Sequence, residues 1–374
     1  MNSKMRRPVL VIGGGVAGGV CALRLRQHGV ETHLAEKVMF PRAKVCGCCL
    51  GGAGLSVLQL VDLKDWVLRN GVITHHWNGS LGRHRIQVPI ASGVAISREL
   101  LDSEILNRLR SLGAVVHAPV AASVESLEAD HVRVALTHPD GRKKYSEYEL
   151  VVLASGLNAT GGNRLLPWKE SPNGPFGASF FAEVDSLQEG VIGMACSDDG
   201  YVGVVRLEDG RFDVAAALAA GARAGSGGRP INRMLNILNE SNLDLGHVKV
   251  VSEIQVTPPL RRSRIAGTGR LMAIGDASGY VEPFTGEGMT WGMMSGYDLA
   301  DLIFYSQPNF DQLGETWGRQ LSRLLATRRR TCRAITSILQ SSVAREGAGY
   351  LLSRVPSLAR PLTSHLSRPW SPTF

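Results

Sequence analysis

Residues 9–37 read VLVIGGGVAGGVCALRLRQHGVETHLAEK and decide the fold. An apolar strand is followed by glycines, an apolar helix, a second short strand and the acid Glu36. Gly13, Gly15 and Gly18 form the pattern GxGxxG, in which the glycines permit a tight turn, close approach of backbone to a pyrophosphate, and close packing of helix on strand. A carboxylate at the end of the second strand can accept hydrogen bonds from both ribose hydroxyls. The stretch therefore predicts a dinucleotide-binding βαβ unit. The residues expected at the nucleotide are Gly13, Gly15, Val16, Ala17, Gly18, Glu36 and Lys37.

The N-terminal residues superficially resemble a secretion signal, because Lys4, Arg6 and Arg7 precede an apolar run. A signal core is a continuous apolar helix, whereas three consecutive glycines break this run after Ile12. No stretch reaches about 18 uninterrupted apolar residues, so a transmembrane helix is not predicted. The six cysteines show no secreted disulfide framework. We therefore expect a cytoplasmic protein.

A second informative stretch, Phe40–Leu58, reads FPRAKVCGCCLGGAGLSVL. Its glycines allow backbone to approach a flat cofactor. The stretch resembles the flavoproteins that include geranylgeranyl reductases, flavin-dependent halogenases and single-component aromatic hydroxylases. In geranylgeranyl reductases an arginine is followed by KVCG and a helix start rich in small residues. The resemblance implies that Arg42 lies beside the ribose and pyrophosphate of FAD, and that Cys46 and Gly47 lie near the isoalloxazine ring.

The cysteine cluster of this stretch also raises the question of a metal site. Its pattern CxCC lacks a second pair of ligands at zinc-like spacing, so no metal is expected. For Cys48 and Cys49, packing of small residues beneath a loop stays open as the alternative. Under the resemblance, Cys46 is a candidate catalytic residue that assists protonation of the substrate.

A third stretch, Gly269–Ile303, reads GRLMAIGDASGYVEPFTGEGMTWGMMSGYDLADLI. Leu271–Ile274 is predicted as a short buried strand, and a helix of small residues is predicted after the glycine loop. In the superfamily that the chain resembles, the aspartate of the GD pair bonds the ribityl chain. The PxTGEG loop presents backbone N–H groups to the pyrimidine edge of the flavin, where a helix N-terminus stabilises negative charge. The resemblance thus implies FAD rather than NAD as the tightly held nucleotide. The matching residues are Gly275, Asp276, Pro283, Gly286, Glu287, Gly288 and Met289.

The segment Gly93–His117 resembles the superfamily's pattern in which an arginine opens a helix whose N-terminus faces the cofactor. That resemblance nominates Arg98, and a salt-bridged surface arginine is the alternative. Further on, a strand at 151–153 is followed by a turn at Ser155 and Gly156, and Gly156 is assigned to the cofactor site. Aromatic hydroxylases usually carry an acidic DG motif at this turn. Because Ser155 stands at the aspartate position, their mode of NADPH docking is in doubt here.

The source of electrons stays open in the sequence. No second GxGxxG follows a strand, so no separate NAD(P)H domain is predicted. NAD(P)H is expected to visit the flavin transiently, or reduced flavin or a redox partner supplies the electrons. In each case FAD carries the redox chemistry, and the protein positions the substrate and excludes water.

Alternating stretches at 121–127, 132–137 and 144–150 predict a small antiparallel sheet. Substrate recognition is assigned to residues 72–92 and 165–259. Within the latter, two apolar stretches at 201–207 and 212–217 flank Asp209-Gly210, which predicts a hairpin.

This hairpin resembles one that shapes the substrate tunnel of geranylgeranyl reductases. Tyr201 matches its tyrosine and is nominated as a catalytic residue. Gly203 and Arg206 stand where bulkier or apolar residues are expected, which implies a wider or differently shaped pocket. Halogenases carry a WxWxI element that none of the six tryptophans forms, so halogenation is not expected.

The net charge of +8 is concentrated near the C-terminus, where residues 319–368 hold ten arginines and a single acid, Glu346. Apolar residues at helical spacings alternate with these arginines, which predicts an amphipathic cationic region. Two interpretations stay open: a helical layer that covers the substrate domain with a solvated arginine face, or peripheral attachment to an anionic membrane that suits a lipid-like substrate. Nucleic acid is not expected, because aromatic residues do not interleave with the charges. The apolar positions are Leu321, Leu324, Leu325, Ile335, Ile338 and Leu339, and the arginines among them are Arg323, Arg328, Arg329, Arg330 and Arg333.

The sequence therefore predicts an α/β (α+β) protein with a glutathione-reductase-like Rossmann FAD domain, an inserted antiparallel substrate domain and a C-terminal helical region. The FAD domain is assigned to residues 1–71, 93–164 and 260–305, the substrate domain to 72–92 and 165–259, and the basic helical region to 306–374. The expected activity is oxidation or reduction of carbon–carbon bonds in a prenyl, long-alkyl or polyketide-like compound by flavin hydride transfer. Hydroxylation of a phenolic or polyketide ring through a peroxyflavin is the alternative. A non-catalytic flavoprotein is a third, and it requires an enclosed flavin without an organic pocket. The oligomeric state is not predicted.

Overall fold

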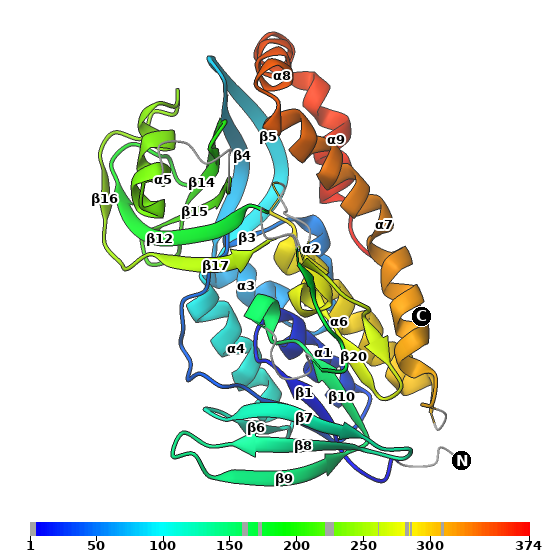
Figure 1. The fold of residues 1–374 in the computed structure, drawn as a ribbon. Coiled ribbons are helices and arrows are strands. Elements are labelled where there is room, and N and C mark those ends of the chain that lie inside the picture. The colour runs from blue at the N-terminus through cyan, green and yellow to red at the C-terminus, as the bar shows by residue number, and fades with distance from the viewer. Residues whose placement is uncertain are drawn as a thin grey trace.

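A computed structural model describes residues 5–158, 164–170, 174–220, 228–260, 262–280, 284, 286–307 and 310–374. Figure 1 shows a lower part built on a parallel sheet, an upper part built on a large curved sheet, and C-terminal helices that run along one side of both. The predicted fold class, an α/β protein with a Rossmann-type domain and a sheet-based second part, is confirmed.

The lower sheet has the strand order β19-β20-β10-β1-β2-β6. Its strands pair in parallel except at β19–β20. The central strands β1, β2 and β10 are almost wholly apolar because both faces of a parallel sheet are covered. The strands predicted at 151–153 and 271–274 are confirmed. The bounds are β1 (Val9–Ile12), β2 (Thr32–Ala35), β6 (Val115–His117), β10 (Leu150–Leu153), β19 (Gly267–Thr268) and β20 (Leu271–Ala273).

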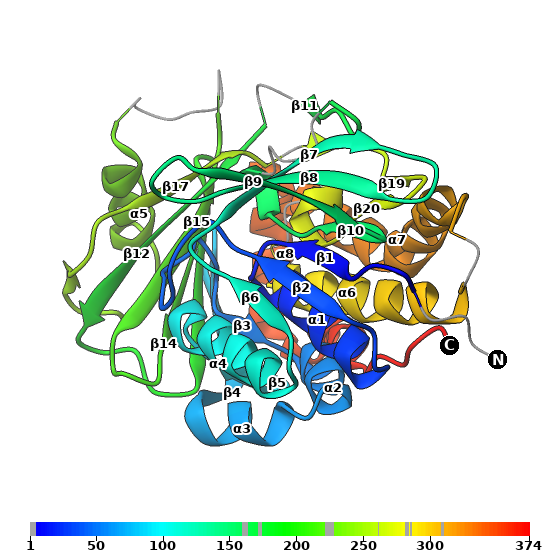
Figure 2. The same cartoon turned by 90° about the horizontal axis from the view of Figure 1, so that it is seen from below.

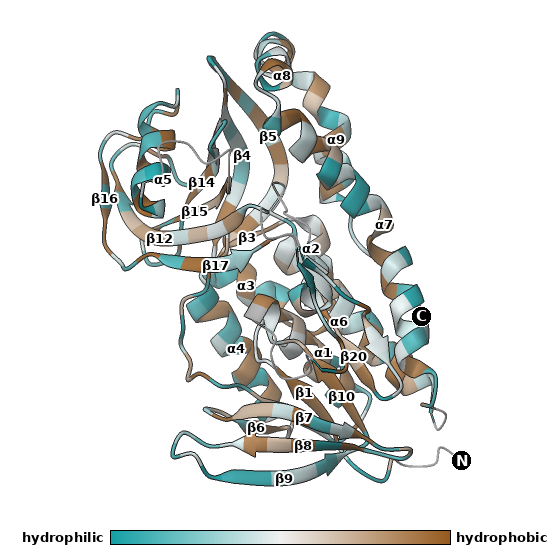
Figure 3. Ribbon diagram, in the orientation of Figure 1, coloured by the Kyte–Doolittle hydropathy of each residue, from teal (hydrophilic) through white to brown (hydrophobic). Residues whose placement is uncertain are grey.

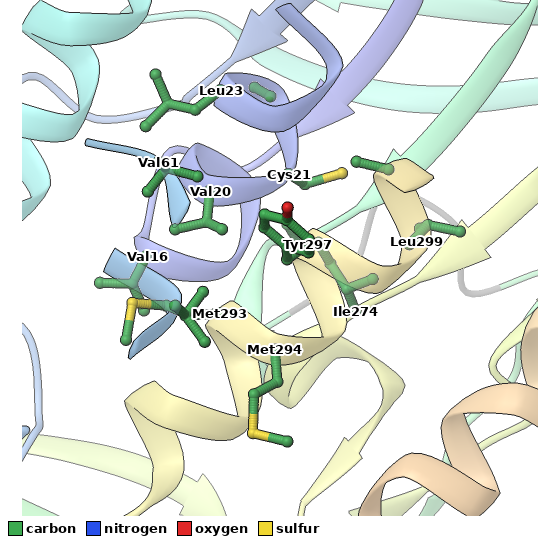
Figure 4. Close-up of a cluster of buried hydrophobic side chains, with 14 of the residues drawn as sticks. Val16, Val20, Cys21, Leu23, Val61, Ile274, Met293, Met294, Tyr297 and Leu299 are labelled. Carbon is green, nitrogen blue, oxygen red and sulfur yellow. The ribbon is translucent and has the colours of Figure 1, made fainter. Parts of the chain in front are cut away.

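Helices cover one face of this sheet, and a small antiparallel sheet covers the other (Figure 2). On the helical face, α1 and α6 pack closely because Gly296 places backbone against the Ala17 carbonyl. Figure 4 shows Val20 of α1 together with Met293 and Tyr297 of α6 in this core. On the opposite face, Leu10 of β1 packs with side chains of β8. The helices are α1 (Val16–Gln27), α2 (Gly52–Leu60), α3 (Lys64–Asn70), α4 (Arg98–Ser111) and α6 (Gly288–Tyr305), and the small sheet is β7 (Ala121–Leu127), β8 (Val132–Thr137) and β9 (Lys143–Tyr148).

The upper sheet has the order β16-β12-β15-β14-β13-β4-β5-β3, with β17 paired to β12. The predicted hairpin is confirmed, because β14 and β15 pair antiparallel from Arg206–Phe212 to Gly200–Leu218. Helix α5 (Pro230–Asn239) packs on one face. The bounds are β3 (Cys49–Leu50), β4 (Val72–Leu81), β5 (His84–Ala95), β12 (Phe176–Val184), β13 (Val191–Ser197), β14 (Gly200–Arg206), β15 (Phe212–Leu218), β16 (Val248–Val250) and β17 (Gln255–Pro259).

One feature of the upper sheet differs from the prediction, since β13 and β4 pair in parallel. The two strands come from chain segments that are separated by part of the lower domain, so no hairpin fixes their relative direction. Strand β5 also continues to Ala95, past the end of the 72–92 segment assigned to the substrate domain. Short strands β11 (Lys169–Glu170), β18 (Arg262–Ser263) and β21 (Gly279–Tyr280) form a separate small antiparallel sheet.

The C-terminal region is helical, as predicted, with α7 (Leu313–Gln340), α8 (Ser342–Arg354), a 3₁₀ turn η4 (Pro356–Ala359) and α9 (Arg360–Ser367). Figure 3 shows hydrophilic and hydrophobic bands alternating along α7. Helix α8 packs on the β4–β5 hairpin so closely that a Cβ at Gly349 would lie 2.6 Å from the Leu81 carbonyl oxygen. The chain then returns to the lower domain, where the Trp370 N–H donates to Ser56 Oγ of α2 at 2.9 Å. Among the described residues, no helix is both long and apolar enough to cross a bilayer.

Candidate functional site

The β1–α1 turn has the backbone geometry that its glycines predict. Gly13 adopts φ +116°, and a Cβ there would lie 2.5 Å from the Ala154 carbonyl oxygen. A Cβ at Gly18 would overlap the Gly13 carbonyl, so the third glycine lets helix α1 lie against β1. A Cβ at Gly15 would instead lie 3.2 Å from Arg98 Nη2 and 3.3 Å from Lys44 Nζ. The second glycine thus places bare backbone beside two cationic side chains.

The acid at the end of β2 is held among hydrogen-bond donors. Glu36 is only 4% exposed, and its Oε2 accepts the Gly14 N–H at 2.9 Å and Arg42 Nη2 at 3.0 Å. The Arg42 guanidinium also lies over the Phe40 ring. Glu36 and Arg42 therefore lie together, whereas the Lys37 side chain is exposed to solvent.

Arg98 is the first residue of α4, which Ser97 caps by accepting the Leu100 N–H. Its guanidinium makes a bidentate pair with Asp102, at 2.9 Å from Nε and 2.7 Å from Nη2. Arg98 is 6% exposed, so the alternative of a surface arginine is wrong. Lys44 lies beside it, and burial, followed by repulsion from Arg98, lowers the pKa of the Lys44 amine. Lys44 was not nominated from the sequence, although it stands in the KVCG motif that pointed to Cys46.

The GD pair begins a 3₁₀ turn, η3 (Gly275–Ser278), at the end of β20. Gly275 adopts φ +55° and donates its N–H to Ser295 Oγ of α6 at 2.9 Å. Burial raises the pKa of the Asp276 carboxyl, and the nearby Lys44 opposes that change. The turn therefore places Asp276 close to the cations that face Gly15.

The loop before α6 is anchored by the C-terminal region. Glu287 is 7% exposed and forms an ion pair with Arg328 of α7. Burial raises the pKa of Glu287, and Arg328 acts against that rise. Arg328 therefore faces the interior, whereas Arg323, Arg330 and Arg333 of the same helix are exposed to solvent. Arg345 of α8 is likewise buried, and it pairs with Asp198 at 2.6 Å.

Among the charged groups described above, Lys44, Arg98, Asp276 and Glu287 line one cavity of about 500 Å³. At one end lie the β1–α1 turn, Lys44, Arg98 and the η3 turn. At the other end the walls are apolar and come from the upper sheet and the inner faces of α7, α8 and α9. The C-terminal helices thus form a wall of the chamber, which supports the interpretation of a covering layer. The apolar end includes Trp77, Ile90, Met194, Phe284, Leu339 and Leu352.

Most residues nominated from the sequence line this cavity. Those that do are Gly15, Val16, Ala17, Cys46, Gly47, Arg98, Gly156, Tyr201, Gly275, Asp276, Gly286, Glu287, Gly288 and Met289. Gly13, Gly18, Glu36, Lys37 and Arg42 are not among the lining residues, and the first two support the turn instead. Pro283 lies outside the described residues.

Tyr201 lies on β14, and its ring meets Phe284 edge to face with centroids 5.0 Å apart. The space beside Gly203 is occupied in part by Met194, whose Cε would be 3.4 Å from a Cβ at that glycine. Arg206 lies off the cavity and pairs with Glu189 at 3.4 Å, so it does not shape the pocket as the sequence analysis expected.

A group of thiols and one carboxyl lies at the cavity, where Cys46, Cys49 and Asp213 are lining residues. The Cys48 N–H donates to Cys46 Sγ at 3.4 Å. A hydrogen bond from the Cys48 thiol, assisted by Arg98, lowers the pKa of Cys46 to about 6 despite burial. Cys48 has a left-handed backbone, with φ +51°, and packs among apolar side chains that include Val205.

Asp213 of β15 completes this group, and sequence reasoning did not nominate it. The residue is 3% exposed and lines the cavity. Burial raises its pKa well above the ordinary value, Cys46 adds to the rise, and a hydrogen bond with Cys48 opposes it. The available signal was an acid inside an otherwise apolar strand, FDVAAAL, where a buried charge is costly. Across the described residues, no cluster of three or more His, Cys, Asp or Glu side chains could hold a metal ion.

Comparison with curated proteins gives distant relatives. The chain is 24% identical to a menaquinone reductase of Mycobacterium tuberculosis over 79% of this chain and 76% of that protein. It is 24% identical to a chloroplastic geranylgeranyl diphosphate reductase of Oryza sativa, over 84% of this chain and 70% of that enzyme. A conditioned medium factor receptor 1 of Dictyostelium discoideum is 23% identical, and the match spans 62% of its length and 79% of this chain. No family model matches the chain.

Comparison with solved structures gives the same fold. A flavin-dependent brominase superposes with a TM-score of 0.79 at 16% identity, covering 96% of this chain and 93% of the brominase. A p-nitrophenol 4-monooxygenase from Pseudomonas putida DLL-E4 superposes with a TM-score of 0.79 at 15% identity, over 98% of this chain and all of the monooxygenase. Sequence relatives and structural neighbours therefore confirm the resemblance to the superfamily of FAD-dependent reductases, monooxygenases and halogenases.

Proposed function

We propose that this protein is an FAD-dependent oxidoreductase that reduces or oxidises carbon–carbon bonds of a hydrophobic prenyl, long-alkyl or polyketide-like substrate. One observation carries the proposal: a nucleotide-type site and an apolar chamber are the two ends of a single cavity. Substrate and cofactor would then meet without an intervening wall. A non-catalytic flavoprotein needs no such chamber.

The residues present fit FAD at the polar end. Gly15, Lys44 and Arg98 would hold the pyrophosphate, because a bare backbone, the buried Arg98 and the half-buried Lys44 suit an anion at the start of α1. Glu36 would accept the ribose hydroxyls, and Asp276 would bind the ribityl chain. The backbone of residues 286–289, at the start of α6, would face the pyrimidine edge. When bound, FAD would supply the hydride chemistry.

The chain's own contribution is to select and enclose the substrate. Apolar side chains from the upper sheet and the C-terminal helices favour a long hydrocarbon and exclude water from the reacting bond. Tyr201 and Cys46 are the polar groups that we nominate beside the reacting atoms. Relatives named for reduction of menaquinone and of geranylgeranyl diphosphate support a prenyl compound as the first substrate to examine.

The test is anaerobic turnover with those two compounds. The FAD-bound protein is reduced with NADPH, NADH or dithionite and mixed with geranylgeranyl diphosphate or menaquinone without oxygen. We expect the oxidised flavin spectrum to return, with a product two hydrogens heavier by mass spectrometry; for menaquinone the added hydrogens must remain in the isoprenoid chain after air has reoxidised the quinol ring. Gly13→Val, which overlaps the Ala154 carbonyl, serves as the control that loses FAD. If reduced flavin persists with both compounds, and oxygen instead produces a transient absorbing species and a hydroxylated phenol, the monooxygenase replaces this proposal.

We also propose that the C-terminal region contacts anionic lipid surfaces. Exposed apolar side chains lie on α8 and η4, among them Leu351 and Leu358. Some other residues of the same two elements line the chamber. Exposed arginines flank them, and the Arg354 guanidinium lies over the Tyr350 ring. Apolar side chains with arginines around them favour insertion at a negatively charged interface. A lipid substrate would then reach the chamber from the bilayer.

Sedimentation with vesicles tests this contact. We expect binding to phosphatidylglycerol vesicles that weakens with salt, and little binding to phosphatidylcholine. The double variant Leu351→Ser/Leu358→Ser should lose binding. Ile265→Ser, at another apolar side chain that is 61% exposed, should retain it. Equal sedimentation of the double variant and the wild type would remove the lipid contact.

A further inference from the structure

We propose that Asp213 is the proton donor of the cavity and protonates the substrate carbon that does not receive the hydride. The inference rests on the proposed reductase function and assigns the acid of that reaction. It begins from the charged side chains that line the cavity. Among the described lining residues these are Lys44, Arg98, Asp213, Asp276 and Glu287.

Asp213 differs from the others in its partners. Arg98 is paired with Asp102, Glu287 is paired with Arg328, and Lys44 and Asp276 lie within each other's influence. The Asp213 carboxyl has a thiol for a neighbour, because it hydrogen-bonds with Cys48. Its Oδ2 has no hydrogen-bond partner among the described residues. An uncompensated carboxylate in such surroundings is costly, so the group is expected to keep its proton.

The neighbouring elements reinforce the protonated state. In the sheet, Asp213 lies opposite Phe181 of β12 and Val205 of β14, both apolar. Cys46 and Cys48, from the loop before β3, and Cys49, the first residue of β3, approach it, and Cys46 carries the lowered pKa.

The basic groups of this neighbourhood form their ion pairs with carboxylates other than Asp213. Arg98 binds Asp102, and Arg211, whose guanidinium lies over Phe181, binds Glu99 and Asp209. When a thiol and a carboxyl lie together in an apolar wall, the negative charge of one raises the pKa of the other. One member of the pair therefore stays ionised and the other stays protonated.

This assignment changes the role expected of Cys46. With its pKa lowered to about 6, the Cys46 thiol is expected to be ionised at neutral pH and then has no proton to give, whereas a protonated carboxyl has one. In the step, hydride adds to one carbon of the substrate double bond, and the electron pair of that bond takes the Asp213 proton at the other carbon. Asp213 is left as a carboxylate, and a proton from water restores the acid. The Cys46 thiolate, held by Cys48 and Arg98, is a positioning residue that keeps Asp213 protonated.

Infrared spectroscopy of the FAD-bound protein tests the resting state without turnover. We expect the wild type to show the carbonyl stretch of a protonated carboxylic acid at neutral pH, and Asp213→Asn to lack it. Asp209→Asn is the matched control, since Asp209 lies on the same hairpin but is exposed and paired with Arg211. Because burial also raises the pKa values of Asp276 and Glu287, the readout is the wild-type-minus-variant difference spectrum, and absence of a protonated-carboxyl band from that difference overturns the proposal.

Turnover of geranylgeranyl diphosphate or menaquinone tests the transfer step. Removing the acid is expected to lower kcat at least about 100-fold with KM little changed. Asp213→Glu should restore the infrared band and part of kcat, and Asp213→Ser takes the place of Asp213→Asn if that variant does not fold. In wild type, kcat should fall as pH rises through the Asp213 pKa. Unchanged kcat in Asp213→Asn overturns the proton donor while the reductase stands. Failure of the wild type with both compounds, with the band present, instead overturns the reductase function.

Discussion

The half-buried Cys46 thiol and the buried Asp213 carboxyl line the same cavity, and their pKa values move in opposite directions. The Cys46 thiol receives hydrogen bonds and the influence of Arg98, so its anion is stabilised. Asp213 meets apolar strands and a thiol, so its neutral form is stabilised. Groups with separated pKa values are typical of sites that carry out acid–base chemistry. At the scale of single residues, the ionisation of Cys46 and the protonation of Asp213 can each be measured.

Alkylation by iodoacetamide measures the ionisation of Cys46, because only the thiolate reacts. We expect the modification rate of Cys46, located by peptide mass spectrometry, to be half-maximal near pH 6. Cys48→Ala removes the donor thiol and should move the midpoint upward. Cys196→Ala, which changes a thiol whose pKa is raised by burial, should leave the midpoint unmoved. A midpoint near the ordinary thiol value of 9.0 in the wild type would contradict the assignment.

Unfolding as a function of pH measures the cost of keeping Asp213 protonated. The folded state retains a proton that the unfolded chain releases above the ordinary value of 3.8. The Asp213 contribution to the unfolding free energy, taken as wild type minus Asp213→Asn, should therefore decrease with rising pH above that value by about 1.4 kcal/mol per pH unit, until the folded-state pKa is passed. Asp213→Asn should lose this decrease and be more stable than the wild type at pH 7. Parallel pH profiles in urea denaturation would show that Asp213 is ionised in the folded protein.

At the scale of elements, glycines decide where helices can approach strands. Along α8, Gly349 faces the Leu81 carbonyl and Gly347 faces open space. The same contrast occurs on α7, where Gly314 abuts Thr268 and Gly318 has no neighbour within 4 Å. Each helix therefore has one glycine required by packing and one that is not.

Alanine substitutions on α8 test this contrast. Gly349→Ala should lower the unfolding free energy by about 1–3 kcal/mol, because its Cβ would lie 2.6 Å from the Leu81 oxygen. Gly347→Ala should raise it by up to about 1 kcal/mol, since alanine is the better helix former and meets no atom. Chemical denaturation of both variants gives the comparison. Equal effects would show that α8 does not press on the β4–β5 hairpin.

At the scale of the whole molecule, the C-terminal helices connect the cofactor-type domain to the upper sheet. Arg328 reaches Glu287 at the start of α6, and the last residues return to α2. Inner faces of α7, α8 and α9 line the chamber between these anchors. The basic region is therefore part of the site and also part of the surface (Figure 1).

Removing the Arg328 side chain tests that connection. Both partners of the Arg328–Glu287 pair are buried, with side chains 12% and 8% exposed, so Arg328→Ala leaves an unpaired acid. We expect a loss of about 3–5 kcal/mol at pH 7 and weaker FAD binding. The loss should diminish as pH falls, because protonation of Glu287 removes the uncompensated charge. Arg323→Ala, at an exposed position of the same helix, should change stability by less than about 0.5 kcal/mol. Thermal unfolding and FAD titration give both values, and equal results for the two variants would contradict the connection.

The sequence by itself determined the βαβ unit, the GD turn, the hairpin at residues 200–218 and the helical C-terminal region. Each depends on local sterics or on an apolar period that a short stretch already contains: Gly13 needs a positive φ, and alternating residues of β14 and β15 select a hairpin. Only the tertiary structure decided which distant groups meet. Cys46 and Asp213 are far apart in the chain, and nothing in either segment specifies the other. The amphipathic pattern of α7 likewise shows that one face is buried but not against what, so the pairing of Arg328 with Glu287 follows from the packing of whole elements.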